Sequence, residues 1–187
     1  MVALAASAGG LNALSHVLAA LPADFPATLA VVQHLDPRHR SLMSAILTRR
    51  IALPVKDAED GEVVVPGRVY LARPNRHLLV NPDRSLSLTQ TELVHFVRPS
   101  ADLLFESVAA SFRDRAIAVV LSGTGNDGAM GVRAIKKMGG TVLVQDAASA
   151  EFDGMPNAAR ATGCADFILD LDEIAPALRK LCSPSDD

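Results

Sequence analysis

Short apolar runs alternate with amphipathic segments along most of this chain. Apolar runs of strand length, bounded by turn residues, cover residues 2–6, 27–34, 116–123, 141–146 and 166–171. Amphipathic segments, with apolar residues at helical spacing in the longer ones, cover residues 11–21, 40–50, 100–112, 128–140, 156–162 and 172–182. This alternation predicts a doubly wound α/β fold, in which a mostly parallel sheet is covered by helices on both faces.

Residues 51–91 interrupt this alternation. Here short β-like pieces are separated by the turn signals Pro66-Gly67, Pro74-Asn75 and Asn81-Pro82. We expect a small, mostly antiparallel excursion or set of hairpins inserted in the fold. We further expect residues 1–182 to form a single domain and residues 183–187 to be a frayed C-terminal tail.

Three polar residues follow the predicted strands at their carboxyl ends, where α/β folds of this type place their sites. Ser7 follows the first strand, His34 closes the second, and Asp127 lies in the glycine-rich stretch "SGTGNDG" after the strand at 116–123. A serine hydroxyl becomes a nucleophile when an imidazole removes its proton and a carboxylate orients the imidazole. Their convergence on one sheet edge predicts a Ser-His-Asp triad.

The glycines around these residues suit the same chemistry, although other roles stay open. Gly9 and Gly10 after Ser7 give a strand-turn-helix context like a nucleophile elbow, and those of "SGTGNDG" would let backbone N–H groups face an oxyanion. Alternatively, Ser7 is a turn or N-cap serine, Asp127 is an N-cap, or "SGTGNDG" cradles a phosphate. The phosphate alternative lacks a Walker lysine, and "SAGGLNA" does not match G-x-G-x-x-G.

Charge and composition exclude several classes of protein. The 187 residues carry a net charge of −3, whereas a non-specific nucleic-acid binder is usually basic. No apolar run approaches the roughly 20 residues of a membrane-spanning helix, and no basic segment of a signal peptide precedes the first strand. Cys164 and Cys182 are too few for a disulfide framework or a zinc site. We expect a cytoplasmic protein without membrane insertion and, because the first strand begins at Val2, a domain of a longer chain.

Several segments resemble, in order, the catalytic domain of the CheB-type protein-glutamate methylesterases of bacterial chemotaxis. They include "ASAGGLNAL", "VVQHLDP", "AVVLSGTGNDGAMGVRAIKKMGGTVLVQD" and "SAEFDGMPNAA". The resemblance implies hydrolysis of glutamyl methyl esters on chemoreceptors, and in some members deamidation of receptor glutamines, through an acyl-enzyme without metal or cofactor. It implies that Ser7 is the nucleophile, His34 the base, Asp127 the residue that orients it, and the Thr124 backbone N–H the oxyanion donor. It also implies a regulatory receiver domain, outside these residues, as a partner.

Three positions depart from the family pattern. The family usually has glycine where this chain has Ala5, and many members have threonine at Ala8 and histidine at Val97. The Ala5 methyl would crowd the turn if this position needed a positive φ. The alternative to an esterase is therefore a catalytically weak or inactive module of the same fold that binds a receptor or partner.

Substrate contacts are expected at the rim of the site. A receptor helix that presents carboxylates and esters favours positive charge, so Arg38, Arg40 and Arg98 are predicted rim residues, with solvated surface charge as the alternative. Met155 is predicted to line an apolar part of the cleft, whereas Met130 is expected to pack in the core.

Overall fold

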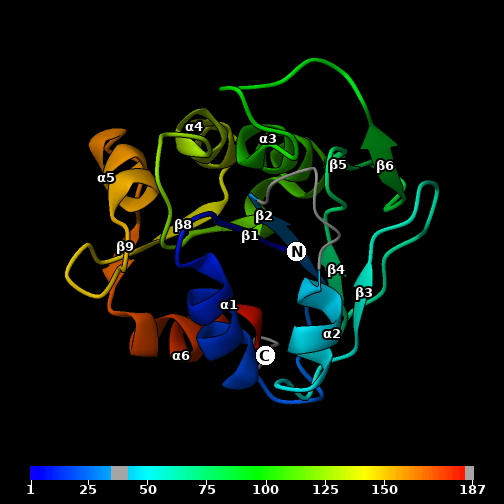
Figure 1. Ribbon diagram of the computed structural model, residues 1–187, viewed down its shortest axis with the longest axis horizontal. Coiled ribbons are helices and arrows are strands. Elements are labelled where there is room, and N and C mark those ends of the chain that lie inside the picture. Colours follow the sequence, from blue (N-terminus) through cyan, green and yellow to red (C-terminus); the bar gives the residue numbers. More distant parts are fainter. Residues whose placement is uncertain (35–41, 184–187) are drawn as a thin grey trace.

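A seven-stranded parallel sheet forms the centre of the molecule (Figure 1). The computed structural model describes residues 1–34 and 42–183. The strands are β1 (Val2–Ala6), β2 (Leu29–Gln33), β3 (Val55–Asp57), β4 (Val69–Leu71), β7 (Ile117–Val120), β8 (Thr141–Gln145) and β9 (Phe167–Leu169). Their order is β3-β4-β2-β1-β7-β8-β9, and every pair of neighbours is parallel.

The winding of the chain reverses at the middle of this sheet. The chain begins at the central strand β1, moves outward through β2 to β3 and β4, and then returns to the other side of β1 at β7. The predicted doubly wound fold is therefore confirmed. The switch point, where such folds hold their sites, lies at the carboxyl ends of β1, β2 and β7.

The prediction for residues 51–91 is only half right. Residues 77–89 do form an antiparallel hairpin of β5 (His77–Val80) and β6 (Leu86–Thr89). Strands β3 and β4, however, join the main sheet as parallel strands, with Leu29 opposite Val69 and Val55 opposite Val69. Each of these strands has three residues, which are too few to show the alternation of apolar and polar positions that is typical of a strand. Their place in the sheet is therefore set by tertiary pairing.

Helices cover both faces of the sheet (Figure 1). One face packs against α1 (Gly10–Ala19), α2 (Met43–Thr48) and α6 (Leu171–Cys182), and the other against α3 (Ala101–Phe112), α4 (Ala129–Lys137) and α5 (Gly154–Ala161). A 3₁₀ turn at Arg113–Arg115 follows α3. No helix in the described part of the chain is long and apolar enough to cross a bilayer.

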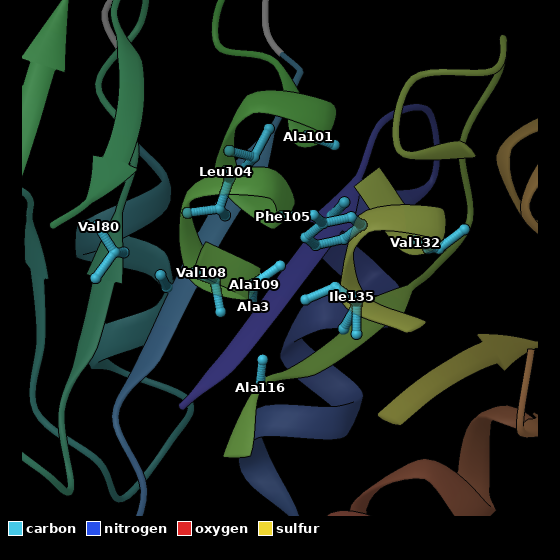
Figure 2. Close-up of a cluster of buried hydrophobic side chains, with 14 of the residues drawn as sticks. Ala3, Val80, Ala101, Leu104, Phe105, Val108, Ala109, Ala116, Val132 and Ile135 are labelled. Atoms are coloured by element: carbon cyan, nitrogen blue, oxygen red, sulfur yellow. The ribbon is translucent and has the colours of Figure 1, made fainter. Parts of the chain in front are cut away.

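The two faces of the sheet differ in side-chain size because successive strand residues point to opposite faces. In β1, Val2 and Leu4 face the α1 and α6 side, whereas Ala3 and Ala5 face α3. Figure 2 shows side chains of α3, among them Val108 and Ala109, beside Ala3. The small residues let α3 lie close to the sheet, so that its first turn reaches the sheet edge where the strands end.

Candidate active site

The register of the sheet places Ser7 between the ends of β2 and β7. The β1–β2 pairing ends with Ala6 opposite Gln33, so Ser7 and His34 come next on adjacent strands. The His34 N–H continues this ladder by donating to the Ala6 carbonyl at 3.0 Å. On the other side, the Ser7 N–H donates to the Ser122 carbonyl at 3.0 Å. Parallel pairing thus brings Ser7, His34 and the glycine-rich loop to one sheet edge.

The turn after Ser7 depends on Gly9. Gly9 has a φ of 72°, a left-handed conformation that favours glycine, and a Cβ there would lie 2.7 Å from the Ser122 Oγ and 2.9 Å from Glu151. Ser7 itself has no positive φ. This turn therefore differs from the predicted nucleophile elbow: its left-handed residue comes two positions after the serine, and Ser7 sits on unstrained backbone.

Asp127 and His34 form a close pair although 93 residues separate them. The His34 Nε2 lies 2.8 Å from the Asp127 Oδ2, and the two side chains are only 11% and 3% exposed. In the neutral imidazole this bond places the ring proton on Nε2, which leaves the lone pair of Nδ1 to accept a proton. The structure therefore brings together the two residues predicted as base and orienting carboxylate.

The Asp127 carboxylate is held by the first turn of α3. Its Oδ1 accepts hydrogen bonds from the Ser100 hydroxyl at 2.8 Å and the Asp102 N–H at 3.0 Å, and its Oδ2 also accepts from the Ala101 N–H at 2.6 Å. Burial raises the pKa of Asp127, but these bonds and His34 outweigh it, so its pKa lies below the ordinary value. Asp127 is thus ionised at neutral pH.

Asp127 caps a different helix from the one that its position in the sequence indicates. It precedes α4, whose N-cap is Gly128, but its side chain satisfies backbone donors of α3 instead. Ser100 is the N-cap of α3, and its Oγ accepts from the Leu103 N–H as well as donating to Asp127. A local capping pattern cannot reveal this long-range role, because it depends on α3 and α4 packing together.

The glycine-rich loop is fixed on both sides of Gly123. The Gly123 N–H donates to the Phe152 carbonyl at 2.9 Å, and its carbonyl accepts from the Met155 N–H at 2.8 Å. The next residue, Thr124, is exposed, and its N–H has no acceptor among the described residues. The role of this N–H as oxyanion donor stays a prediction.

A small pocket of about 160 Å³ borders His34. Its other lining residues are Asn75, Leu93, Phe96, Val97, Arg98 and Pro99. Leu93 is 54% exposed and Phe96 is 94% exposed, so the pocket has an apolar rim. A larger pocket of about 390 Å³ lies at the other end of the strands and contains none of the predicted site residues.

The predicted rim residues have different outcomes. The Arg98 guanidinium donates to the Asn75 side chain, at 2.9 and 2.6 Å, and to the Thr91 carbonyl, so it holds the loop in place besides lining the pocket. Arg38 and Arg40 lie outside the described residues.

The two methionines have the reverse of the predicted places. Met155 is 1% exposed and lies against the backbone of Gly123, so it is not a rim residue. Met130 was assigned to the core, but it is 55% exposed. The first turn of α4 faces solvent at Met130, whereas Met155 lies in the first turn of α5, which packs against the loop at Gly123. Helical spacing alone does not distinguish these cases.

Two of the departures from the family pattern cause no clash. Ala5 lies inside β1, opposite Val32 and Val120, with no positive φ and with its methyl buried in the core. The Ala8 carbonyl accepts a hydrogen bond from the Ser122 hydroxyl at 2.8 Å, an interaction that needs no particular side chain at position 8. No group of three metal-binding side chains occurs in residues 1–34 or 42–183.

Comparisons with known proteins show the family of this chain. The family model described as CheB methylesterase matches residues 2–178. The crystal structure of the Thermotoga maritima CheB methylesterase catalytic domain superposes with a TM-score of 0.92 at 34% identity, covering 96% of this chain and 97% of that one.

Curated relatives fall into two length classes. A Leptospira interrogans protein whose name pairs protein-glutamate methylesterase with protein-glutamine glutaminase is 38% identical over 96% of this chain and 93% of its own. Protein-glutamate methylesterase/protein-glutamine glutaminase 2 of Burkholderia lata is 44% identical over 95% of this chain, and the corresponding Bordetella avium protein is 42% identical over 98%. The chain spans about half the length of the latter two, 52% and 54%. Fold, family model and relatives agree, and this chain belongs to the CheB methylesterase family.

Proposed function

We propose that this chain hydrolyses methyl esters of glutamate side chains on a protein substrate, with Ser7 as the nucleophile. The observation that carries the proposal is the buried His34–Asp127 pair beside Ser7, at the switch point of the sheet. Membership of the family and the names of the relatives support glutamyl methyl ester as the substrate class.

In the first half of the reaction, the Ser7 hydroxyl attacks the ester carbonyl. His34 Nδ1 takes the Ser7 proton as the bond from Oγ to the carbonyl carbon forms, and Asp127 stabilises the resulting imidazolium. The Thr124 N–H donates to the oxyanion. The bond to the methoxy group then breaks, and His34 returns its proton to that group, which leaves as methanol.

The second half hydrolyses the acyl-enzyme. A water gives its proton to His34 as its oxygen attacks the acyl carbon, and collapse of the intermediate returns the proton to Ser7 and releases free glutamate. A glutamine side chain follows the same route with ammonia as the leaving group. Deamidation is therefore a second proposed activity of the same site, supported by the paired names of the relatives.

The proposed substrate is a methylated chemoreceptor or a related protein. The apolar rim at Leu93 and Phe96 offers a surface for residues that flank the ester. A regulatory receiver domain outside this chain is a further proposed partner, and the cytoplasm is the proposed compartment.

The test is methanol release from a methylated receptor fragment by this chain and by Ser7→Ala. The proposal predicts release by the parent and a loss of at least about 1,000-fold in the variant, because the oxyanion donor alone cannot supply a nucleophile. Substantial release by the variant would contradict the assignment of Ser7. Binding of the fragment without release by the parent would favour an inactive binding module.

A further inference from the structure

Gln33 lies at the point where the β1–β2 ladder ends and the predicted nucleophile and base begin. It is the last residue of β2 and pairs with Ala6, the last residue of β1. Its side-chain Nε2 donates to the Ser7 carbonyl at 2.7 Å and to the His34 carbonyl at 3.0 Å. One carboxamide therefore links the backbones of both residues, and it does so just beyond the last ladder bond.

The orientation of this carboxamide is fixed by chemistry. Both nearby acceptors are carbonyl oxygens, so only the NH₂ end can face them; the reverse orientation would put three oxygens together. Its Oε1 is buried and has no hydrogen-bond partner in the described residues. The polar contacts of this side chain among the described residues are therefore made by its NH₂ end, to the backbones of Ser7 and His34.

The glycine at position 10 makes room for this carboxamide. A Cβ on Gly10 would lie 2.1 Å from the Gln33 Oε1 and 2.6 Å from the Ala6 Cβ. Gly10 begins α1, and its N–H donates to the Ser7 carbonyl at 2.9 Å. The Ser7 carbonyl thus accepts from both Gly10 and Gln33, which fixes the backbone of Ser7 from two directions.

We infer that Gln33 is a positioning residue that sets the separation of Ser7 from His34. This inference rests on the proposed function, in which proton transfer from Ser7 to His34 accompanies the attack. The last β1–β2 ladder bond runs from the His34 N–H to the Ala6 carbonyl, and Ser7 is followed by the turn into α1. The Gln33 amide ties the two backbones together just past this bond.

The test compares Gln33→Met with the parent chain. Methionine matches glutamine in length and shape but donates no hydrogen bond. We expect kcat for methanol release to fall about 10- to 100-fold with KM within about threefold, because a displacement of roughly 1 Å between reacting groups costs rates of this order. We also expect the melting temperature to change little, since the variant loses two hydrogen bonds but no longer buries an unpartnered oxygen. A purely structural role predicts the opposite, a lower melting temperature with kcat unchanged.

A second readout isolates the chemical step. A fluorophosphonate probe forms a bond from phosphorus to the Ser7 Oγ and loses fluoride, while His34 takes the serine proton. Its rate of labelling should fall by the same factor as kcat in Gln33→Met. If Gln33→Met does not fold, Gln33→Asn keeps the amide but shortens its reach by one carbon, and should show the same loss. Labelling and kcat within twofold of the parent in a folded variant would overturn the inference.

Thr28→Val is the matched control. Thr28 is 7% exposed and precedes the other end of β2, so this variant also replaces a buried polar residue beside the same strand. We expect its kcat to equal that of the parent. The experiment distinguishes two kinds of failure. If the parent itself releases no methanol, the proposed function is wrong. If the parent is active and Gln33→Met is equally active, only the inference about Gln33 is wrong.

Discussion

Asp127 and Asp102 each cap the helix to which the other is attached. Asp127 binds the N-terminus of α3, which contains Asp102, and Asp102 binds the N-terminus of α4, which follows Asp127. Asp127, just before α4, accepts from the Ala101 and Asp102 N–H groups of α3. Asp102, in the first turn of α3, accepts through Oδ1 from the Gly128 N–H at 2.9 Å and the Gly131 N–H at 2.7 Å of α4. This exchange joins the first turns of two helices and fixes the carboxylate that contacts His34.

The exchange predicts a strong effect of Asp127→Asn on activity. The asparagine amide can still fill the site, but it cannot stabilise the imidazolium, and its NH₂ end conflicts with the N–H donors of α3. We expect kcat to fall on the order of 1,000- to 10,000-fold, as for loss of the carboxylate in other triads. Steady-state methanol release measures this, with Asp83→Asn in the exposed turn before β6 as the control. Activity within tenfold of the parent would remove Asp127 from the mechanism.

The same two carboxyls predict opposite dependences of stability on pH. The folded-state pKa of Asp127 is lowered, so its stabilising contribution is present above its unfolded pKa of about 4 and is lost as pH falls through the folded value. Burial raises the pKa of Asp102, and the charge of Asp127 adds to this, although hydrogen bonds from Gly131 and Gly128 and the charge of His95 oppose it. The contribution of Asp102 is therefore present below pH of about 4 and is lost as pH rises through its folded pKa.

Denaturant unfolding of the parent, Asp127→Asn and Asp102→Asn between about pH 3 and pH 7 measures this difference. The stability advantage of the parent over Asp127→Asn should grow with rising pH. The stability advantage of the parent over Asp102→Asn should instead shrink as the pH rises. Parallel slopes for the two variants would show that the two carboxyls share one environment, contrary to the geometry.

The apolar rim of the His34 pocket predicts a role for Phe96 in binding of the protein substrate. Phe96 is 94% exposed on a loop that Arg98 and the Val94–Val97 pairing hold in place. Burying a phenylalanine against a substrate is worth about 1.5–3 kcal/mol, so Phe96→Ser should raise KM for a methylated receptor fragment about tenfold or more.

The rate with a small soluble ester should be unchanged in Phe96→Ser, because such an ester does not reach the rim. Phe167→Ser, at a 43% exposed position in β9, is the control. Equal loss of activity with the small ester and with the fragment would mean that Phe96 supports the fold of the site and does not contact the substrate.

The substitution Ala5→Gly tests whether alanine affects the enzyme at this position, where the family usually has glycine. Because the Ala5 methyl is buried inside β1, Ala5→Gly removes packing and adds backbone freedom to a strand. We expect a loss of about 1 kcal/mol in the free energy of unfolding and no gain in kcat. A marked rise in kcat would show that alanine at this position limits the enzyme.

Strand ends that are far apart in sequence could be predicted to meet, because a parallel sheet aligns the carboxyl ends of its strands. This rule placed Ser7, His34 and Asp127 on one edge, and the structure brings the His34 and Asp127 side chains into contact. The observed register of β1 and β2 adds to this prediction only the individual backbone hydrogen bonds beside Ser7 and His34.

The parts of the site that depend on packing could not be predicted in this way. The cap that Asp127 gives to α3 needs two helices to meet, and the Gln33 bridge needs β1 and β2 to end at the same level. The exposure of Met130 and the burial of Met155 depend on which side of a helix faces the loop. The parallel pairing of residues 69–71 is likewise a tertiary effect, since three residues carry too little periodicity.

The most direct test of the account is to trap the acyl-enzyme. The chain is mixed with a p-nitrophenyl ester, quenched in acid within the first turnover, and digested for mass spectrometry, alongside His34→Ala and Ser7→Ala. The proposed mechanism predicts one added acyl group on the peptide that contains Ser7, strongly reduced in His34→Ala and missing in Ser7→Ala. Acylation at another residue, or turnover with Ser7 unmodified in a properly quenched sample, would contradict it.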